Sequence, residues 1–195
     1  MNRPKLVKSI AGVIATLAVL IWALAGWLWP DVTDEVKSWL TYNQPGQYFV
    51  ASVADGDTIT VSNGGDSFVV RLIGVDTPET HHPNKPVQCY GEEAGDYLDK
   101  LLAGEVVRLE ADPASDETDR YDRKLRYVYR SSDNLFINKH LVERGYGVSY
   151  KSFEHSKLPS FNRAEQTAMD DNLGLWSACE PFLNQYGVYE TEPAG

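Results

Sequence analysis

The chain has 195 residues, the size of one ordinary domain with a short appendage. Its content of 43% hydrophobic and 24% charged residues excludes an intrinsically disordered or collagen-like chain. The 18 basic residues are outnumbered by 28 acidic ones, which gives a formal net charge of −10. This balance argues against a nucleic-acid partner, because phosphate binding is normally driven by an excess of lysine and arginine.

Residues 10–29 form an uncharged, largely apolar run near the N-terminus. As a helix rising about 1.5 Å per residue, this run would cover roughly 30 Å, the thickness of the hydrocarbon core of a bilayer. Three basic residues and no acidic residue precede it, so the positive-inside rule places residues 1–9 in the cytoplasm. We therefore expect a single-pass anchor in the cell membrane, with residues 30–195 outside.

A cleaved secretory signal peptide is the alternative interpretation of the same segment. Its apolar core would end at Trp22, and the small residues around Ala25 would supply the cleavage site, so that the protein would be secreted. The apolar run continues past this site to Trp29, which a cleaved peptide would not need. The anchor is therefore favoured, and both interpretations export the remaining chain.

Export places the two cysteines, Cys89 and Cys179, in an oxidising compartment. Two cysteines are too few for a disulfide-built scaffold or for a zinc site made of cysteine alone. A disulfide between them is favoured because it would hold the C-terminal segment to the domain. Two unpaired thiols are the alternative.

The exported part begins with a polar stalk at residues 30–46 and continues as short runs rich in β-forming residues. Asn63-Gly64-Gly65 between two runs is a hairpin turn signal, and Asn134 is expected to be the N-cap of a helix. The expected strands are Tyr48–Val53, Thr58–Ser62, Ser67–Ile73, Glu105–Ala111 and Leu125–Arg130, and the expected helices are Glu92–Leu102, Asn134–Val142 and Ser160–Asn172. This pattern predicts an α+β domain over residues 47–178, a small five-stranded barrel covered by three helices. A polar tail follows at 179–195.

Carboxylates concentrate in two short segments at strand ends. Residues 55–57 (Asp-Gly-Asp) lie between the first two expected strands, and residues 76–79 (Asp-Thr-Pro-Glu) follow the third. Arg71 lies in that third strand, where a charged side chain in a core-lined sheet needs a partner. Oxygen donors without histidine or cysteine suit a hard cation, Ca²⁺ or Mg²⁺, rather than zinc. His81 and His82 come next and are expected to be solvated loop residues, because adjacent histidines rarely chelate one ion together.

A third charged segment, residues 118–123 (Thr-Asp-Arg-Tyr-Asp-Arg), leads into the last expected strand. Composition alone would favour a solvated loop with a salt bridge. Carboxylates that hold a metal, together with two arginines, are nevertheless suited to phosphoryl chemistry. The cation polarises a phosphate oxygen, guanidinium groups stabilise the charge of the transition state, and a carboxylate acts as base toward water.

These motifs together resemble the staphylococcal nuclease (thermonuclease) family, Ca²⁺-dependent nucleases built on an OB-fold barrel. The similarity covers residues 47–178, nearly the whole exported part. It is carried by D-G-D-T at 55–58, R-L-I-G-V-D-T-P-E-T at 71–80, Y-G-E-E-A at 90–94 and T-D-R-Y-D-R at 118–123, with support from Asn138, Leu141, Val142 and residues 173–177. The resemblance implies an OB-fold and the hydrolysis of DNA and RNA to products with 3′-phosphate ends.

The resemblance also implies a metal site made of oxygen ligands. Asp57 and Asp76 would bind Ca²⁺ through their carboxylates, and Thr77 would add its backbone carbonyl. Asp55 would lie close by and support the loop without binding the ion directly.

Catalytic and substrate-binding roles follow from the same resemblance. Glu79 would be the general base that aligns the attacking water. Arg71 and Arg123 would hold the phosphate and stabilise the pentacoordinate transition state. Tyr121 and Tyr150 would contact the nucleotide, although Tyr150 matches the family's tyrosine only with a gap of one residue.

The chain departs from the family pattern at Asp122, where the family usually has glycine between the tyrosine and the arginine. If this position requires a positive φ, aspartate adopts it better than most residues. Its charge would nevertheless lie beside Arg123 and weaken the hold on phosphate. The stretch 151–159 also departs from the family's usual form.

A non-catalytic OB-fold module for nucleic-acid binding or scaffolding is the rival function. The enzyme is favoured because all five residues that a decayed site would lose are present: Arg71, Asp57, Asp76, Glu79 and Arg123. No protein partner is inferred, and a monomer is expected. Beyond residue 29 the chain carries 15 basic and 28 acidic residues. We therefore expect local arginines and Ca²⁺, and not the overall charge, to bind the substrate.

Overall fold

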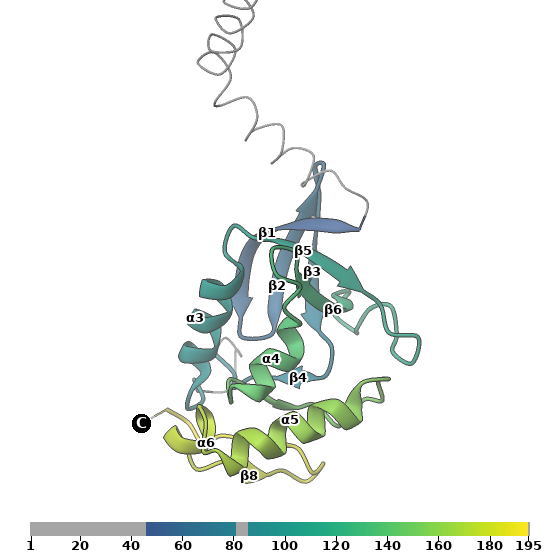
Figure 1. Cartoon of the computed structure of the whole chain (residues 1–195). Coiled ribbons are helices and arrows are strands. Elements are labelled where there is room, and N and C mark those ends of the chain that lie inside the picture. Colours follow the sequence, from purple (N-terminus) through teal and green to yellow (C-terminus); the bar gives the residue numbers. More distant parts are fainter. Residues whose placement is uncertain (1–45, 81–85, 195) are drawn as a thin grey trace, which may run out of the picture. The chain divides into compact units, whose positions relative to one another are not determined.

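The computed structural model describes residues 46–80 and 86–194 (Figure 1). The predicted anchor at 10–29, almost all of the stalk, and His81 and His82 lie outside these residues, and they stay predictions. Within the described part of the chain, no helix is long and apolar enough to cross a bilayer.

Five strands form a closed barrel in the order β1-β2-β3-β6-β5. They are β1 (Gln47–Asp55), β2 (Thr58–Asn63), β3 (Asp66–Leu72), β5 (Val106–Glu110) and β6 (Lys124–Arg130). Neighbouring strands are antiparallel except for β3 and β6, which are parallel, and β1 pairs with both β2 and β5 to close the barrel. Gly64 and Gly65 form the predicted hairpin turn, with φ of 65° and 116°. The expected five-stranded barrel is confirmed.

Three helices pack on this barrel, as predicted: α3 (Gly91–Leu102), α4 (Ile137–Glu143) and α5 (Leu158–Asp170). In Figure 1, α3 runs beside the strands, and α5 crosses below α4. α3 buries Ala94, Leu98 and Leu102, which are spaced four residues apart and so lie on one face. Leu98 and Leu102 join strand residues and the inner faces of α4 and α5 in one core, which includes Ile59, Val61, Val70, Leu72, Val107, Tyr127, Ile137, Leu141 and Phe161.

Asn134 is not the N-cap of α4, contrary to the prediction. It adopts a left-handed conformation (φ 57°) in the turn after β6, and α4 begins three residues later at Ile137. The reason is a bridge between Phe136 and Tyr129 of β6, which keeps Phe136 extended and delays the start of the helix. The helix ends at Glu143, one residue after the predicted end, and Gly145 follows it with a φ of 72°.

The buried amide of Asn138 ties α4 to the barrel. Its Oδ1 accepts a hydrogen bond from the N–H of Val128 at 2.8 Å. Its Nδ2 donates to the carbonyls of Ile73 and Arg126, both at 3.0 Å. Because the amide bonds both to β6 and to the residue just after β3, it fixes the chain at the point where the candidate site begins.

Two pairs of short strands complete the domain. β4 (Val75–Asp76) pairs with β7 (Val148–Ser149), so that Asp76 lies opposite Val148. After the short helix α6 (Leu175–Ala178), β8 (Phe182–Leu183) and β9 (Tyr189–Glu190) form a hairpin. Cys89 and Cys179 form a disulfide, which confirms the predicted pairing. The segment expected to be a polar tail is therefore folded and attached to the chain before α3.

Candidate active site

The candidate site forms where the turn between β1 and β2 meets the end of β3. The strand register pairs Thr58 with Arg71, and the Asp57 carbonyl accepts a hydrogen bond from the N–H of Leu72 at 2.9 Å. Strand pairing alone therefore places Asp57 beside Arg71. The short strand β4 then brings Asp76 to the same place.

Arg71 joins the two aspartates. Its Nη2 lies 2.8 Å from Asp57 Oδ2 and 2.7 Å from Asp76 Oδ1. Its Nη1 donates to the carbonyls of Leu72 at 2.9 Å and Val75 at 2.7 Å. The Arg71 side chain is only 12% exposed, so these partners and not bulk water stabilise its charge. They are the partners that a charged residue in this strand requires.

Thr77 contacts the same oxygen of Asp57 as Arg71 does. Its N–H and its Oγ1 donate to Asp57 Oδ2, at 3.1 and 3.2 Å. Gly56 permits this approach, because a Cβ at position 56 would lie 2.7 Å from Thr77 Oγ1. Asp55 Oδ1 accepts the N–H of Asp57 at 3.0 Å and closes the turn. Asp55, Asp57, Asp76 and Thr77 therefore lie close together, and Thr77 contacts Asp57 through its N–H and its hydroxyl.

Burial and like charge raise the pKa of two carboxylates in this cluster. Burial raises the pKa of Asp76 to about 6; the Arg71 charge opposes the shift, and the Asp57 charge adds to it. Burial and the Asp57 charge likewise raise the pKa of Asp55 to about 6. Burial disfavours the charged form of Arg71, but the carboxylates of Asp57 and Asp76 raise its pKa. Negative charge is therefore in excess here, and a bound cation would relieve it.

The second predicted arginine reaches the cluster through a threonine. Arg123 Nη1 lies 3.4 Å from Thr58 Oγ1, and that hydroxyl donates to Asp57 Oδ1 at 3.0 Å. Arg123 Nε donates to Asp119 Oδ2 at 2.7 Å, which orients the guanidinium. The Tyr121 ring, 64% exposed, has its centroid 5.4 Å from the Arg123 Cζ. The Arg123 guanidinium therefore lies over an exposed aromatic ring, and Arg120 Cζ lies 4.7 Å from the same ring centroid.

Tyr150 and Glu79 lie on the side of β4. The Tyr150 ring centroid is 5.8 Å from the Arg71 Cζ, and the backbone N–H of Tyr150 donates to the Gly74 carbonyl at 3.0 Å. Glu79 Oε1 accepts a hydrogen bond from the N–H of Thr80 at 3.0 Å. Burial is the main cause of the raised pKa of Asp76, and the charge of Glu79 adds to it, so Glu79 lies near the cluster.

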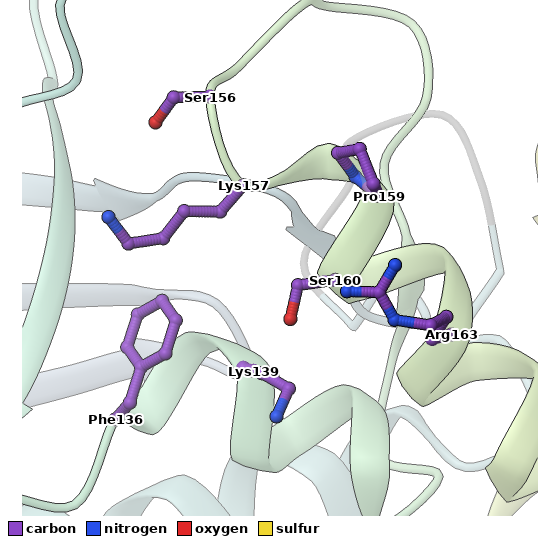
Figure 2. A pocket seen from close by; sticks show the side chains of 7 residues that line it. All are labelled: Phe136, Lys139, Ser156, Lys157, Pro159, Ser160 and Arg163. Carbon is purple, nitrogen blue, oxygen red and sulfur yellow. The ribbon is translucent and has the colours of Figure 1, made fainter.

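Over residues 46–80 and 86–194, no three His, Cys, Asp or Glu side chains gather as a metal centre. A separate concavity of about 410 Å³ lies where the start of α5 faces α4 (Figure 2). None of the predicted site residues lines it, and two of its cations are paired with carboxylates, Lys157 with Glu110 and Lys139 with Glu143.

Comparison with known proteins shows which family the chain belongs to. The family model described as staphylococcal nuclease homologue matches residues 69–178. The chain belongs to the staphylococcal nuclease family. It is 40% identical over 136 residues to the thermonuclease of Staphylococcus hyicus, covering 67% of this chain and 75% of the relative. It is 39% identical over 131 residues to the thermonuclease of Staphylococcus intermedius, covering 66% and 75%. It is 39% identical over 125 residues to the endonuclease YncB of Bacillus subtilis (strain 168), covering 63% and 58%.

Asp122, the departure from the staphylococcal nuclease pattern, adopts a φ of 62°. This position therefore needs the left-handed conformation that glycine adopts most readily. The turn is held by Asp119, whose Oδ1 accepts the N–H groups of Tyr121 at 2.9 Å and Arg123 at 3.0 Å. The substitution keeps the turn and adds a carboxylate next to the second arginine.

Three residues of this site were not singled out in the sequence analysis. Thr58 links Arg123 to Asp57, and Asp119 orients Arg123. Both lie inside the family motifs, and the four-residue spacing from Asp119 to Arg123 was a usable signal. Gln88 has no such signal in the sequence, because its side chain bonds to the Glu79 N–H and to the Thr191 carbonyl in the distant C-terminal segment.

Proposed function

We propose that the chain is a calcium-dependent extracytoplasmic nuclease that hydrolyses phosphodiester bonds of DNA and RNA and leaves 3′-phosphate ends. Family membership and the nuclease-named relatives support the nuclease activity. The observation that carries the proposal is the convergence of Asp57 and Asp76 on Arg71, with Arg123 linked to Asp57. The acidic composition argued against a nucleic-acid partner, and that inference was wrong because it used the overall charge where binding depends on a local site.

The carboxylates of Asp57 and Asp76 and the carbonyl of Thr77 would hold Ca²⁺. These donors are all oxygens, and both carboxylates already face a single cationic nitrogen of Arg71. The donor set therefore fits a hard cation whose remaining positions are filled by water. When bound, the ion polarises a phosphate oxygen and neutralises negative charge.

Arg71 and Arg123 would bind the scissile phosphate and stabilise the charge of its transition state. A guanidinium donates through a planar fork that matches two phosphate oxygens. Glu79 would accept a proton from the attacking water and align it. Tyr121 and Tyr150 would offer ring faces to the bases, since stacking on aromatic side chains is tolerant of sequence.

The extracytoplasmic location has one structural support and one support from the sequence. The Cys89–Cys179 disulfide is typical of proteins in oxidising compartments. Residues 10–29 would anchor the chain in the cell membrane, with secretion after cleavage near Ala25 as the alternative. The apparent mass of the membrane-bound protein, compared with that of any protein released to the medium, distinguishes the two.

The full-length chain should be assayed on denatured DNA and on RNA, with Ca²⁺ and with chelator. We expect degradation only with Ca²⁺, unchanged circular dichroism in chelator, and products that a polymerase extends only after phosphatase treatment. Glu79→Gln should lower the rate by about 100-fold or more, and the exposed helix residue change Glu93→Gln should leave it unchanged. A wild-type chain no more active than Glu79→Gln would favour the non-catalytic module.

A further inference from the structure

The backbone of Glu79 is held by one residue nine positions later. Gln88 donates its N–H to the Glu79 carbonyl at 2.8 Å. The side-chain Oε1 of Gln88 accepts the N–H of Glu79 at 2.7 Å. Both backbone groups of Glu79 are thus bonded to Gln88, which fixes the point from which the Glu79 carboxylate extends.

Gln88 is held in turn by the C-terminal segment. Its Nε2 donates to the Thr191 carbonyl at 3.1 Å, across 103 residues of sequence. The neighbouring Cys89 donates its N–H to the Glu192 carbonyl at 2.8 Å and accepts from Thr191 Oγ1 at 2.9 Å. The Cys89–Cys179 disulfide adds a covalent link to the same part of the chain. The segment 191–194 therefore lies along residues 87–89 as an added strand-like support.

The C-terminal segment is packed firmly enough to act as a support. Val188 and Thr191 are buried, and Val188 packs in a small cluster with Leu175 and Val148. Val148 is the residue that pairs with Asp76 across β4 and β7. One cluster therefore connects the C-terminal segment with the strand that carries a predicted metal ligand.

We propose that Gln88 is a positioning residue for Glu79, and that the C-terminal segment, residues 187–194, is a structural part of the active site. This inference rests on the proposed function, because it assigns Glu79 the role of base. The amide of glutamine suits the task, since it accepts from the Glu79 N–H and donates to the Thr191 carbonyl at once. Glutamate could only accept, and leucine could do neither.

The first test measures kcat and KM on denatured DNA for the full chain carrying Gln88→Leu or Gln88→Glu. Gln88→Leu should lower kcat by about 10- to 100-fold, as removal of an orienting partner does elsewhere, with KM changed less than about threefold. Gln88→Glu keeps the acceptor for the Glu79 N–H and should lower kcat less than Gln88→Leu does. The matched control is Gln166→Leu, on the exposed face of α5, which should match wild type.

A double-mutant comparison separates positioning from general damage. In a Glu79→Gln background, Gln88→Leu should change the residual rate by less than about twofold, because its effect passes through Glu79. The same loss in both backgrounds, or no loss in either, would overturn the inference.

The second test does not depend on activity. Hydrogen exchange of the Glu79 amide should be slow in the full chain and at least about tenfold faster in Gln88→Leu and in a chain ending at Tyr186. The shortened chain keeps Cys179 and the disulfide, and Thr191→Val is a milder variant should the truncation unfold. If the wild-type chain is inactive, but its Glu79 amide exchanges slowly and Gln88→Leu accelerates that exchange, the proposed function is rejected and the support by Gln88 stands. If the wild-type chain is active and Gln88→Leu leaves the exchange of the Glu79 amide unchanged, only the support by Gln88 is rejected.

Discussion

Arg71 Nη2 lies 2.8 Å from Asp57 Oδ2, so a residue proposed to bind phosphate is paired with a residue proposed to bind metal. The same nitrogen contacts Asp76 at 2.7 Å. The guanidinium therefore holds two carboxylates together that would repel each other without it. Arg71 has a structural role in assembling the site as well as its proposed role toward the substrate.

Replacing Arg71 with methionine should lower the free energy of unfolding by about 3 kcal/mol in chelator, because two poorly hydrated carboxylates lose their partner. Added Ca²⁺ should restore part of this loss, since a cation would again lie between them. Urea unfolding with and without Ca²⁺ measures both effects. As a control, Arg108→Met removes an ion pair with Glu110 in which the arginine side chain is 44% exposed. It should lower the free energy of unfolding by less than about 1 kcal/mol. An Arg71→Met chain as stable as wild type in chelator would contradict the structural role.

Asp112 should make the protein sensitive to acid. Burial alone would raise its pKa, but hydrogen bonds from Ser156, Tyr127 and the Ala114 N–H lower it from 3.8 to about 2. Between these values the unfolded chain binds the proton and the folded chain does not. About 2 kcal/mol of stability is therefore present above pH 4 and is lost as the pH falls toward 2.

Urea unfolding between pH 2 and 6 tests this dependence. Asp112→Asn should be less stable than wild type at pH 6 and should show a flatter decline toward pH 2. The exposed Asp116→Asn should keep the wild-type slope. Equal slopes for wild type and Asp112→Asn would show that other groups govern the acid response.

The barrel could be predicted from local patterns, and the site residues from motifs. Apolar Ile59 and Val61 alternate with Thr60 along β2, and the following glycine pair marks its turn. The start of α4 could not be predicted, because the bridge from Phe136 to β6 overrides the capping preference of Asn134. The link between Gln88 and Thr191 joins residues without any local signature, so only the folded structure reveals it.

Asp122 allows the conformation and the charge of one position to be tested separately. Asp122→Ala should lower the free energy of unfolding by about 1 kcal/mol, because alanine adopts a φ near 62° poorly. Asp122→Asn should keep the stability and lower KM for DNA severalfold, because it removes a carboxylate beside Arg123. Thermal unfolding and steady-state kinetics measure the two effects. Equal KM values for Asp122→Asn and wild type would mean that the carboxylate does not weaken phosphate binding.

Binding of single-stranded DNA should depend weakly on salt. If only Arg71 and Arg123 contact phosphates, the slope of log K against log salt should be about −1.4. The measurement uses the slowly reacting Glu79→Gln chain at fixed Ca²⁺, and adding Arg123→Gln should reduce the slope by about 0.7. A slope steeper than about −4 would reveal further cationic contacts that the acidic composition hides.

The close approach of Gly56 to Thr77 restricts which residue can stand at position 56. A side chain at position 56 would push Thr77 away from Asp57 and break the hydrogen bond between them. Position 56 is therefore restricted by the space that Thr77 leaves, although glycine has no functional group of its own. The glycine of the Asp-Gly-Asp sequence thus contributes to the site through its lack of a side chain.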